Sequence, residues 1–392
     1  QVRTHSARSA ETPTTSGRDQ GLWELSLAGG AEAALLSEAL EIQWSWGHRY
    51  PPEYERYTSQ FHWHSATLNI ASASKLFDAL GPLPTEATVA DPFCGSGTVL
   101  IESLLRGYAS YGTDVSPLAH ALSSYHTFRP AEASESLARI RAAAETAVAA
   151  VPSERIFGSK AADPNCELWA SLSTALSEAA QASSLTAEEF GVMLFCLSVT
   201  LERTRAYGKK RGKIAPVRIF AKAAQQFCVA LEKLAAAVPA GTPNPVVSLC
   251  DARKLELPKV VDAIVTSPPY PAVYDYLSAA REVRARLPTQ LPLEHLPRGS
   301  MAPFFATDKP ARADGGPDRA EWPQSWTAGE LGARKEFRRS ETTAAFADAW
   351  EASTRAWLSA AHANLAPQGR MAVLIGDGES ARGAEVERGE AG

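Results

Sequence analysis

The sequence lacks the features that define several large classes of protein. Its five cysteines lie far apart and no two form a C-x-x-C pair, which argues against a disulfide framework and a zinc knuckle. No apolar run approaches the roughly 18 residues that a membrane-spanning helix needs. Lys and Arg (39) do not outnumber Asp and Glu (44), and the net charge of -5 excludes a protein that coats nucleic acid by bulk charge, although not one with a local basic face. We therefore expect a cytoplasmic protein in a reducing setting, with no membrane partner.

What the sequence does contain divides into five segments of different character. The first, rich in Ser, Thr and Arg, predicts a disordered tail. The next three predict the first part of an α/β domain, an inserted helical subdomain and the second part of the α/β domain, because the helical stretch is far longer than the roughly dozen residues of a crossover connection. A polar tail closes the chain. The bounds of the five segments are 1–20, 21–127, 128–243, 244–378 and 379–392.

Short apolar or β-branched runs that end at polar or glycine-containing turns predict five strands. They are Ala87–Ala90, Ala109–Gly112, Pro245–Leu249, Val260–Val265 and Met371–Ile375. Apolar spacing of three and four predicts a helix over Thr186–Arg203, where Thr186 and Glu189 match a capping box. Other helices are expected over Val99–Arg106, Ala131–Val151 and Pro216–Val238. The expected fold class is α/β, with a mostly parallel sheet and helices on both faces.

A glycine-containing loop follows the first predicted strand and leads into a helix. Its sequence is Asp91-Pro92-Phe93-Cys94-Gly95-Ser96-Gly97-Thr98. The glycines allow the main chain to approach a ligand closely, and the helix N-terminus presents backbone N–H groups. Asp91 can accept a hydrogen bond from an amino group, and Asp114, after the second strand, is placed to bind both hydroxyls of a ribose. The loop has neither a Walker lysine nor the G-x-G-x-x-G fingerprint, and taken alone it could be a simple turn.

A second motif, Thr266-Ser267-Pro268-Pro269-Tyr270, stands at the end of the fourth predicted strand. Two prolines fix the backbone and leave carbonyl acceptors without local partners. Hydrogen bonds from an exocyclic amine to Ser267 and to the Pro268 carbonyl would favour a tetrahedral nitrogen, and Tyr270 would stack on an extruded base. Such chemistry rests on positioning and needs no dedicated base. The alternative is a structural proline turn.

In these two motifs the sequence resembles the amino-group DNA methyltransferases that use S-adenosylmethionine. The Ser-Pro-Pro-Tyr version at Ser267 is typical of the cytosine-N4 branch, whereas the adenine-N6 branch more often has Asp or Asn there. The resemblance implies a Rossmann-like methyltransferase fold and transfer of a methyl group to N4 of a flipped cytosine in DNA. It also implies that the two motifs meet at neighbouring strand ends of one sheet.

The same resemblance assigns residues to the cofactor and to the base. It implies cofactor contacts for Asp91, Phe93, Gly95, Ser96, Gly97, Thr98, Asp114 and Asp251, of which Asp251 would face the adenine amino group. It implies that Ser267, Pro268, Pro269 and Tyr270 act on the base. A further family motif has a loose counterpart at Phe61–Ala66, where His62 and His64 lack a convincing third ligand, so no metal is expected. The family usually adds two strands after the fifth, and here only Gly376-Asp377-Gly378 and a polar tail follow, which predicts an incomplete sheet or an altered tail.

Basic residues concentrate within 11 positions of the helical segment. They are Arg203, Arg205, Lys209, Lys210, Arg211 and Lys213. Such a cluster can neutralise backbone phosphates, and we expect it to contact DNA, although a solvated helix end is the alternative. The stretch 296–336, rich in Pro, Gly, Asp and Arg, predicts a long surface loop.

Three alternatives to the cytosine-N4 reading stay open. An adenine-N6 DNA methyltransferase would share the fold and the cofactor. An RNA methyltransferase acting on guanine N2 has a similar glycine loop, but such enzymes usually carry Asp in place of Ser267 and an added RNA-binding domain. A non-catalytic methyltransferase-like nucleic-acid binder is the third. For the first reading the expected partners are DNA and, where a restriction system is present, its cognate endonuclease.

Overall fold

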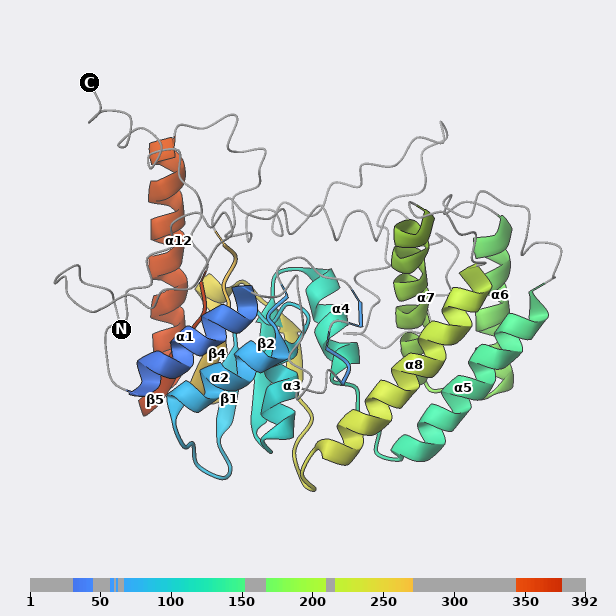
Figure 1. The fold of residues 1–392 in the computed structure, drawn as a ribbon, viewed down its shortest axis with the longest axis horizontal. Coiled ribbons are helices and arrows are strands. Elements are labelled where there is room, and N and C mark those ends of the chain that lie inside the picture. The colour runs from blue at the N-terminus through green and yellow to red at the C-terminus, as the bar shows by residue number, and fades with distance from the viewer. Residues whose placement is uncertain are drawn as a thin grey trace, which may run out of the picture.

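A computed structural model describes residues 31–44, 57–59, 61–62, 67–151, 167–208, 216–270 and 343–375. Its elements, in chain order and labelled as in Figure 1, are α1 (Ala31–Trp44), α2 (Ile70–Leu80), β1 (Thr88–Asp91), α3 (Thr98–Leu105), β2 (Ala109–Asp114), α4 (Pro117–His126), α5 (Ala133–Ala150), α6 (Glu167–Ala182), α7 (Ala187–Gly208), α8 (Pro216–Ala237), β3 (Val246–Leu249), η2 (Ala252–Lys254), β4 (Val261–Thr266), α12 (Thr343–Asn364) and β5 (Leu365–Val373). The expected tail 1–20 and the expected loop 296–336 lie outside the described residues.

The five strands form one sheet in the order β3-β2-β1-β4-β5, and every neighbouring pair is parallel. Strands β1 and β4 are paired through Val89 with Ala263 and Ala90 with Ile264. The chain leaves β1 toward β2 on one side and returns later through β4 on the other. The strand order therefore reverses between β1 and β4, and ligands of such sheets bind in the crevice at the C-terminal ends of the strands at this point.

Both faces of the sheet are covered by helices, which confirms the predicted Rossmann-like α/β fold. On one face Val89, Ala263 and Val265 pack in a cluster with Leu76 and Phe77 of α2. On the other face Ala90 and Ile264 pack in a cluster with Trp357 and Ala361 of α12. Because successive residues of a strand point to opposite faces, these short apolar strands are buried on both sides.

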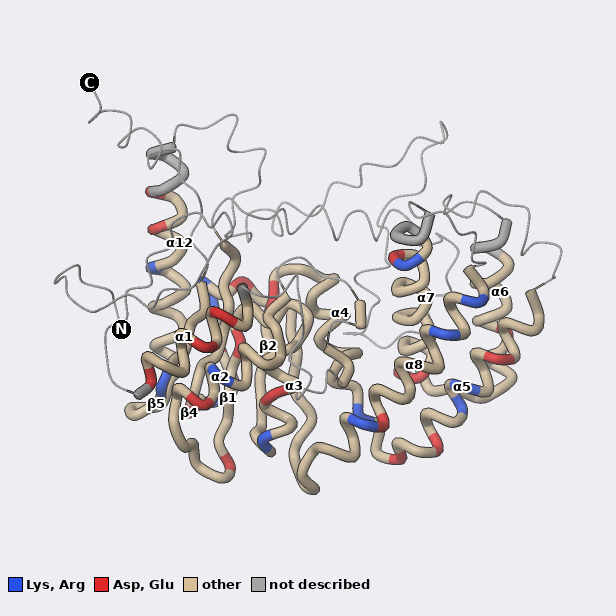
Figure 2. The backbone as a smooth tube through the Cα atoms, in the orientation of Figure 1, with Lys and Arg blue, Asp and Glu red and all other residues tan. Residues whose placement is uncertain are grey.

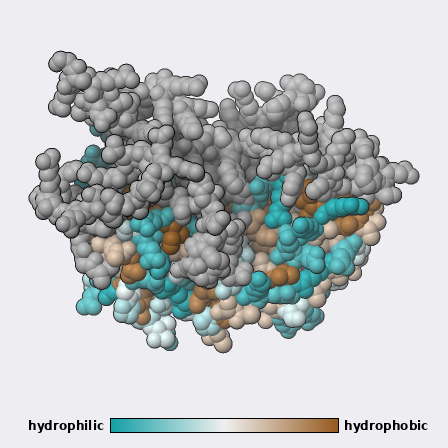
Figure 3. Space-filling view, viewed as in Figure 1, coloured by the Kyte–Doolittle hydropathy of each residue, from teal (hydrophilic) through white to brown (hydrophobic). Residues whose placement is uncertain are grey.

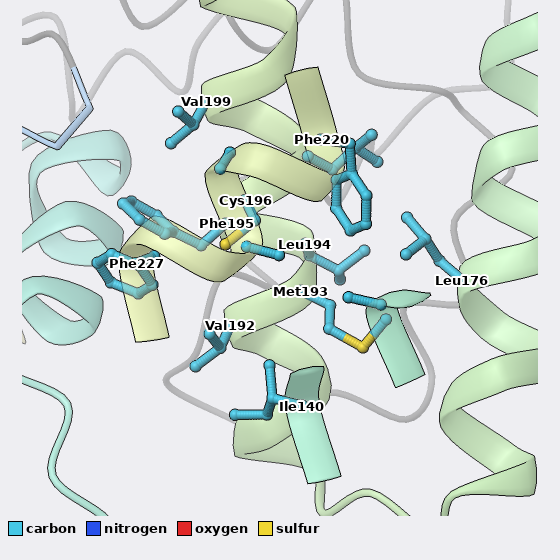
Figure 4. Packing of buried hydrophobic residues seen from close by; sticks show 14 of the residues in the cluster. Ile140, Leu176, Val192, Met193, Leu194, Phe195, Cys196, Val199, Phe220 and Phe227 are labelled. Atoms are coloured by element: carbon cyan, nitrogen blue, oxygen red, sulfur yellow. The ribbon is translucent and has the colours of Figure 1, made fainter. Parts of the chain in front are cut away.

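Helices α5 to α8 build a second layer beside the sheet with its own apolar core (Figures 1 and 4). Phe195 of α7 and Phe220 and Phe227 of α8 are fully buried there. The predicted capping box is present, because Thr186 N–H donates to Glu189 Oε2 (2.9 Å) and Glu189 N–H donates to Thr186 Oγ1 (3.2 Å). Helix α7 then continues five residues beyond the predicted end at Arg203.

The last strand differs most from its prediction. Strand β5 begins at Leu365 rather than at Met371, and it passes through the exposed residues Pro367 and Gln368. The register of β5 with β4 shifts between Val261 and Ala263. The first half of β5 faces solvent and has no apolar pattern, so the sequence did not predict it.

Figure 3 shows the molecular surface from the same side as Figure 1. Among the described residues on this side, hydrophobic ones appear in small separate areas between hydrophilic ones. No helix in the described ranges is both long and apolar enough to cross a membrane.

Candidate active site at the C-terminal edge of the sheet

The glycine loop (Asp91–Thr98) runs from β1 into α3 along the C-terminal edge of the sheet. Gly95 and Gly97 both have positive φ, 51° and 83°. A Cβ added at Gly97 would lie 2.9 Å from Ser123 Cα, so the loop packs directly on α4. No side chain in the described ranges caps the first turn of α3, so within these ranges its N–H groups are available to a ligand.

One polar atom of the glycine loop is buried without a hydrogen-bond partner among the described residues. Thr98 is 3 % exposed, and its Oγ1 has no hydrogen-bond partner among the residues that the structure describes. A buried hydroxyl without a partner is costly in a folded protein, because the group has lost its water. Thr98 Oγ1 at the N-terminus of α3 is therefore an atom that a bound ligand would satisfy.

Two buried acidic side chains, Asp91 at the start of the loop and Asp114 at the end of β2, have raised pKa values. Burial raises the pKa of Asp91 to about 7, with nearby Asp114 adding to the rise, whereas hydrogen bonds from Thr266 and from the backbone of Phe93 oppose it. Burial also raises the pKa of Asp114 to about 6, against hydrogen bonds from backbone N–H groups. No described Lys or Arg forms an ion pair with either carboxylate. The site favours a positively charged ligand, because such a ligand would stabilise both ionised carboxylates.

Asp114 also supports the loop directly. Its Oδ2 accepts a hydrogen bond from the N–H of Gly95 (3.1 Å), and its Oδ1 accepts one from the N–H of Ser116 (2.8 Å). The C-terminal position predicted for Asp114 on the second strand is confirmed. The carboxylate that was expected at a ribose therefore also holds Gly95 in place.

The proline turn (Ser267–Tyr270) follows β4 at the same edge of the sheet. Thr266 Oγ1, just before it, donates a hydrogen bond of 2.6 Å to Asp91 Oδ1, and both residues are buried. The two motifs are thus connected by one hydrogen bond at the point where the strand order reverses. Their expected meeting at neighbouring strand ends is confirmed.

The proline turn is more accessible than the strand that precedes it. Ser267, Pro269 and Tyr270 are half-buried, whereas Thr266 is fully buried. Ser267 Oγ donates to Tyr270 Oη at 3.3 Å, so the hydroxyl and the aromatic ring lie side by side. A serine oxygen, rigid backbone and an accessible aromatic ring therefore lie together next to the glycine loop.

Two further residues expected at the cofactor have partners of their own. Asp251 caps η2 and binds Arg253 through both carboxylate oxygens, with a shortest contact of 2.6 Å, and this pair keeps the pKa of Asp251 below its usual value despite partial burial. Phe93 packs edge-on against Trp357 of α12, with ring centroids 5.2 Å apart. Cys250 N–H donates to the Asp114 carbonyl, which keeps the segment before Asp251 near the end of β2.

His126, at the end of α4, had no role in the sequence analysis. It is fully buried, and its Nδ1 lies 2.7 Å from the carbonyl oxygen of Ser96. Because a carbonyl can only accept, Nδ1 carries the hydrogen. The ring also packs edge-on against Phe195 of α7 at 5.4 Å. His126 thus joins the glycine loop to the core of the helical layer, a contact that sequence spacing alone gives no means of finding.

The basic cluster is described only at its start. Arg203 Nη1–H donates to Gln226 Oε1 at 3.2 Å, and its guanidinium lies 4.7 Å from the centre of the Phe61 ring. For Arg205 only the helical backbone is described, and Lys209, Lys210, Arg211 and Lys213 lie outside the described residues. In the motif expected at Phe61–Ala66, only Phe61 and His62 are described, and both pack near Phe195.

Comparison with known proteins identifies the family of the chain. A family model described as "RMKL-like, methyltransferase domain" matches residues 59–282, more than half of the chain. The chain belongs to the RMKL-like methyltransferase family. As a member of this family it is a methyltransferase, and S-adenosylmethionine is its methyl donor.

Two solved structures are similar to the chain. The structures are those of the rRNA methyltransferase aviRa from Streptomyces viridochromogenes at 1.5 Å and 2.4 Å. Each is 16 % identical to this RMKL-like protein and covers 64 % of it, with 74 % and 75 % of their own chains covered and TM-scores of 0.26 and 0.23. No curated protein matches the chain.

The site fits S-adenosylmethionine on its own chemistry. The cofactor carries an ammonium and a sulfonium, and the RMKL-like protein presents two desolvated carboxylates, Asp91 and Asp114, without a described cation. The glycine loop leaves no space for a side chain at Gly97, and the hydroxyl of Thr98, which has no hydrogen-bond partner in the described part of the chain, lies at the adjacent helix N-terminus.

Proposed function

We propose that the protein transfers a methyl group from S-adenosylmethionine to the exocyclic amino nitrogen of a nucleobase. The observation that carries the proposal is the position of the proline turn beside the glycine loop, joined to it by the hydrogen bond between Thr266 and Asp91. A donor held by one loop and an acceptor held by the other would meet across the crevice between β1 and β4.

The cofactor supplies an electrophilic methyl group on a sulfonium; the chain supplies position and charge. Asp91 would bind the ammonium of the amino-acid end, the backbone from Gly95 to Thr98 would face that end, and Asp114 would bind the ribose hydroxyls. Phe93 borders the site from its contact with Trp357. Asp251 would accept a hydrogen bond from the adenine amino group. Its contact with Arg253 could remain, because a carboxylate oxygen accepts more than one hydrogen bond.

At the base, the proline turn orients the amine. Ser267 Oγ and the Pro268 carbonyl accept hydrogen bonds from the exocyclic amine, which removes its lone pair from conjugation with the ring. Pro269 fixes the turn, and Tyr270 stacks on the base. A new N–C bond then forms as the S–C bond breaks, and the amine releases one proton to water.

The first candidate for the base is N4 of cytosine in DNA, because the turn begins with Ser267. Membership of the RMKL-like family favours a second candidate, N2 of guanine in RNA. Both amines are attached to an aromatic ring and need the same acceptors. The basic cluster (Arg203, Arg205, Lys209, Lys210, Arg211 and Lys213) would contact the backbone of either nucleic acid.

Nucleoside analysis tests the proposal. The protein is incubated with methyl-labelled S-adenosylmethionine and with unmodified DNA or RNA, which is then digested and analysed by mass spectrometry. N4-methylcytosine from DNA supports the first candidate and N2-methylguanine from RNA supports the second. N6-methyladenine would support transfer to an exocyclic amine but would show that the base is adenine. Label only on a ring carbon, on ribose or on protein contradicts the proposal.

Variants of the proline turn link the product to the site. Ser267→Ala and Tyr270→Ala should each lower the transfer rate at least tenfold, because each removes a contact to the reacting base. Ser134→Ala, an exposed serine on α5, is the matched control and should leave the rate unchanged. Rates within a few-fold of wild type in both turn variants would refute the assignment.

A further inference from the structure

Several arginine and lysine side chains in or next to the described helices form ion pairs with carboxylates. Arg139 pairs with Glu135 and Glu189, Arg141 pairs with Glu232, and Arg106, Lys75 and Arg355 likewise contact acidic side chains. By contrast, Arg203 on α7 and Arg218 and Lys222 on α8 form no ion pair with a described carboxylate. We name these three the α8 cation row.

Helix α8 fixes the direction in which two of these charges point. Its buried face consists of apolar residues such as Val217, Phe220, Ala224 and Phe227, packed against the core of the helical layer. Arg218 and Lys222 lie four residues apart on the opposite face, and both are exposed. Residues 216–231 contain no acidic residue, so this part of the helix presents only positive charge.

Arg203 extends the row from the neighbouring helix. Its side chain is held by the ring of Phe61 and by Gln226, which lies one further turn along the exposed face of α8 after Lys222. A guanidinium held in this way loses less side-chain entropy when it binds an anion. Figure 2 shows basic residues on the upper parts of α7 and α8, the ends that point to the same side of the molecule as the C-terminal ends of the strands.

The geometry of the row suits a chain of regularly spaced anions. Four residues of an α-helix rise about 6 Å, a spacing comparable to that of successive phosphates along one strand. A single small anion would use one cation, whereas a phosphodiester backbone can use all three. A solvated helix face would more often intersperse both signs of charge.

We propose that the α8 cation row binds backbone phosphates of the nucleic-acid substrate, at a distance from the base that is methylated. The proposal rests on the proposed function, because the partner it names is that substrate. It assigns a role to Arg218 and Lys222, which lie outside the basic cluster of the sequence. DNA and RNA share this backbone chemistry, so the test includes both.

Salt dependence of binding tests the row. The full-length double variant Arg218→Gln/Lys222→Gln is compared with wild type on a labelled DNA duplex, the same DNA as a single strand, and the corresponding RNA. The logarithm of affinity falls with the logarithm of salt by about 0.9 for each phosphate contact to duplex DNA and by about 0.7 to a single strand. The double variant should therefore reduce the slope by about 1.8 on duplex and by about 1.4 on single strands.

The matched control removes the same residue types elsewhere. Arg355→Gln/Lys259→Gln changes one arginine on α12 and one exposed lysine before β4, and its slope should equal that of wild type. An unchanged slope in Arg218→Gln/Lys222→Gln, with native circular dichroism, overturns the proposal, as does a wild-type protein that binds neither DNA nor RNA. An equal loss of slope in the control overturns it as well.

The two proposals can fail separately. A wild-type protein that methylates nucleic acid, with an unchanged slope in the row variant, refutes the row and leaves the proposed function. A wild-type protein that transfers no methyl group to nucleic acid, but whose binding slope falls in the row variant, refutes the proposed function and leaves the row. The nucleic acid that wild type binds more tightly at equal salt identifies the source of the phosphates.

Discussion

The hydroxyl of Thr266 donates a hydrogen bond of 2.6 Å to Oδ1 of Asp91, although the two residues lie 175 positions apart in the sequence. The contact joins the end of β4 to the end of β1, the two strands between which the sheet order reverses. It fixes the start of the proline turn relative to the glycine loop. Each motif is therefore positioned by the other as well as by its own strand.

Replacing Thr266 with Val should shift the pH dependence of cofactor binding. Burial raises the pKa of Asp91 to about 7, and the Thr266 hydrogen bond opposes that rise, so its loss raises the pKa further. If ionised Asp91 binds the ammonium as proposed, affinity for S-adenosylhomocysteine should rise with pH through about 7 in wild type but through a higher pH in Thr266→Val. Calorimetric titration from pH 6 to 9 measures both midpoints.

A buried threonine far from the site provides the control for this shift. Thr200 donates to the carbonyl of Cys196 within α7, and Thr200→Val should leave the midpoint where it is in wild type. Identical midpoints in Thr266→Val and wild type would show that the hydrogen bond does not tune Asp91.

Replacing Asp91 with Asn should stabilise the protein without cofactor at neutral pH. Both hydrogen bonds to Asp91, from Thr266 Oγ1 and Phe93 N–H, end on Oδ1, which Asn keeps. The carboxyl ionises near 3.8 in the unfolded chain and near 7 when folded, so the folded state holds an extra proton between these pH values. The free energy of unfolding of wild type therefore falls as pH rises from about 4 to about 7.

Urea unfolding at pH 4.5 and at pH 8 measures this difference. Asp91→Asn should exceed wild type by about 2–4 kcal/mol at pH 8 and by much less at pH 4.5, on the basis of about 1.4 kcal/mol per pKa unit. The variant should bind S-adenosylhomocysteine more weakly at pH 8. A variant less stable than wild type at both pH values would contradict the buried, desolvated carboxylate.

Gly97→Ala should reduce both stability and cofactor affinity. The positive φ of 83° strains any other residue, and the added Cβ would lie 2.9 Å from Ser123 Cα. Gly241→Ala has a nearly equal φ of 82° but no atom within 4 Å of its Cβ, so it isolates the backbone strain, about 1–2 kcal/mol. Thermal unfolding of both variants should show a larger loss for Gly97→Ala, and equal losses would argue against a tightly packed loop.

His126 should act on the cofactor through Ser96, and two variants separate its contacts. His126→Phe keeps a ring against Phe195 but removes the donor to the Ser96 carbonyl, and affinity for S-adenosylhomocysteine should fall roughly 5–10-fold, as expected for about 1 kcal/mol. His126→Asn keeps a donor near Nδ1 but removes the ring, and it should lose stability more than affinity. Calorimetry measures the affinity of both variants, and unfolding experiments measure their stability. If the two variants lose affinity only in proportion to their loss of stability, this role of His126 is contradicted.

The sequence predicted the five strands because short apolar runs stop at polar turns, and apolar spacing predicted four of the helices, α3, α5, α7 and α8. It predicted the meeting of the two motifs because parallel strands end at one edge. The start of β5 could not be predicted, since Pro367 and Gln368 are exposed and the register shifts there. Nor could the contact between His126 and Phe195, which depends on how the helical layer packs against α4. The family resemblance predicted a cofactor contact for Asp251 and did not predict its ion pair with Arg253, two residues away.

We propose that donor and acceptor share the crevice between β1 and β4, and a crystal structure of the protein with S-adenosylhomocysteine tests this arrangement most directly. We predict the amino-acid end of the ligand against Gly95–Thr98, its ammonium at Asp91, and its sulfur directed toward the proline turn. A ligand bound elsewhere, or one whose sulfur faces away from Ser267 and Tyr270, would contradict the claim.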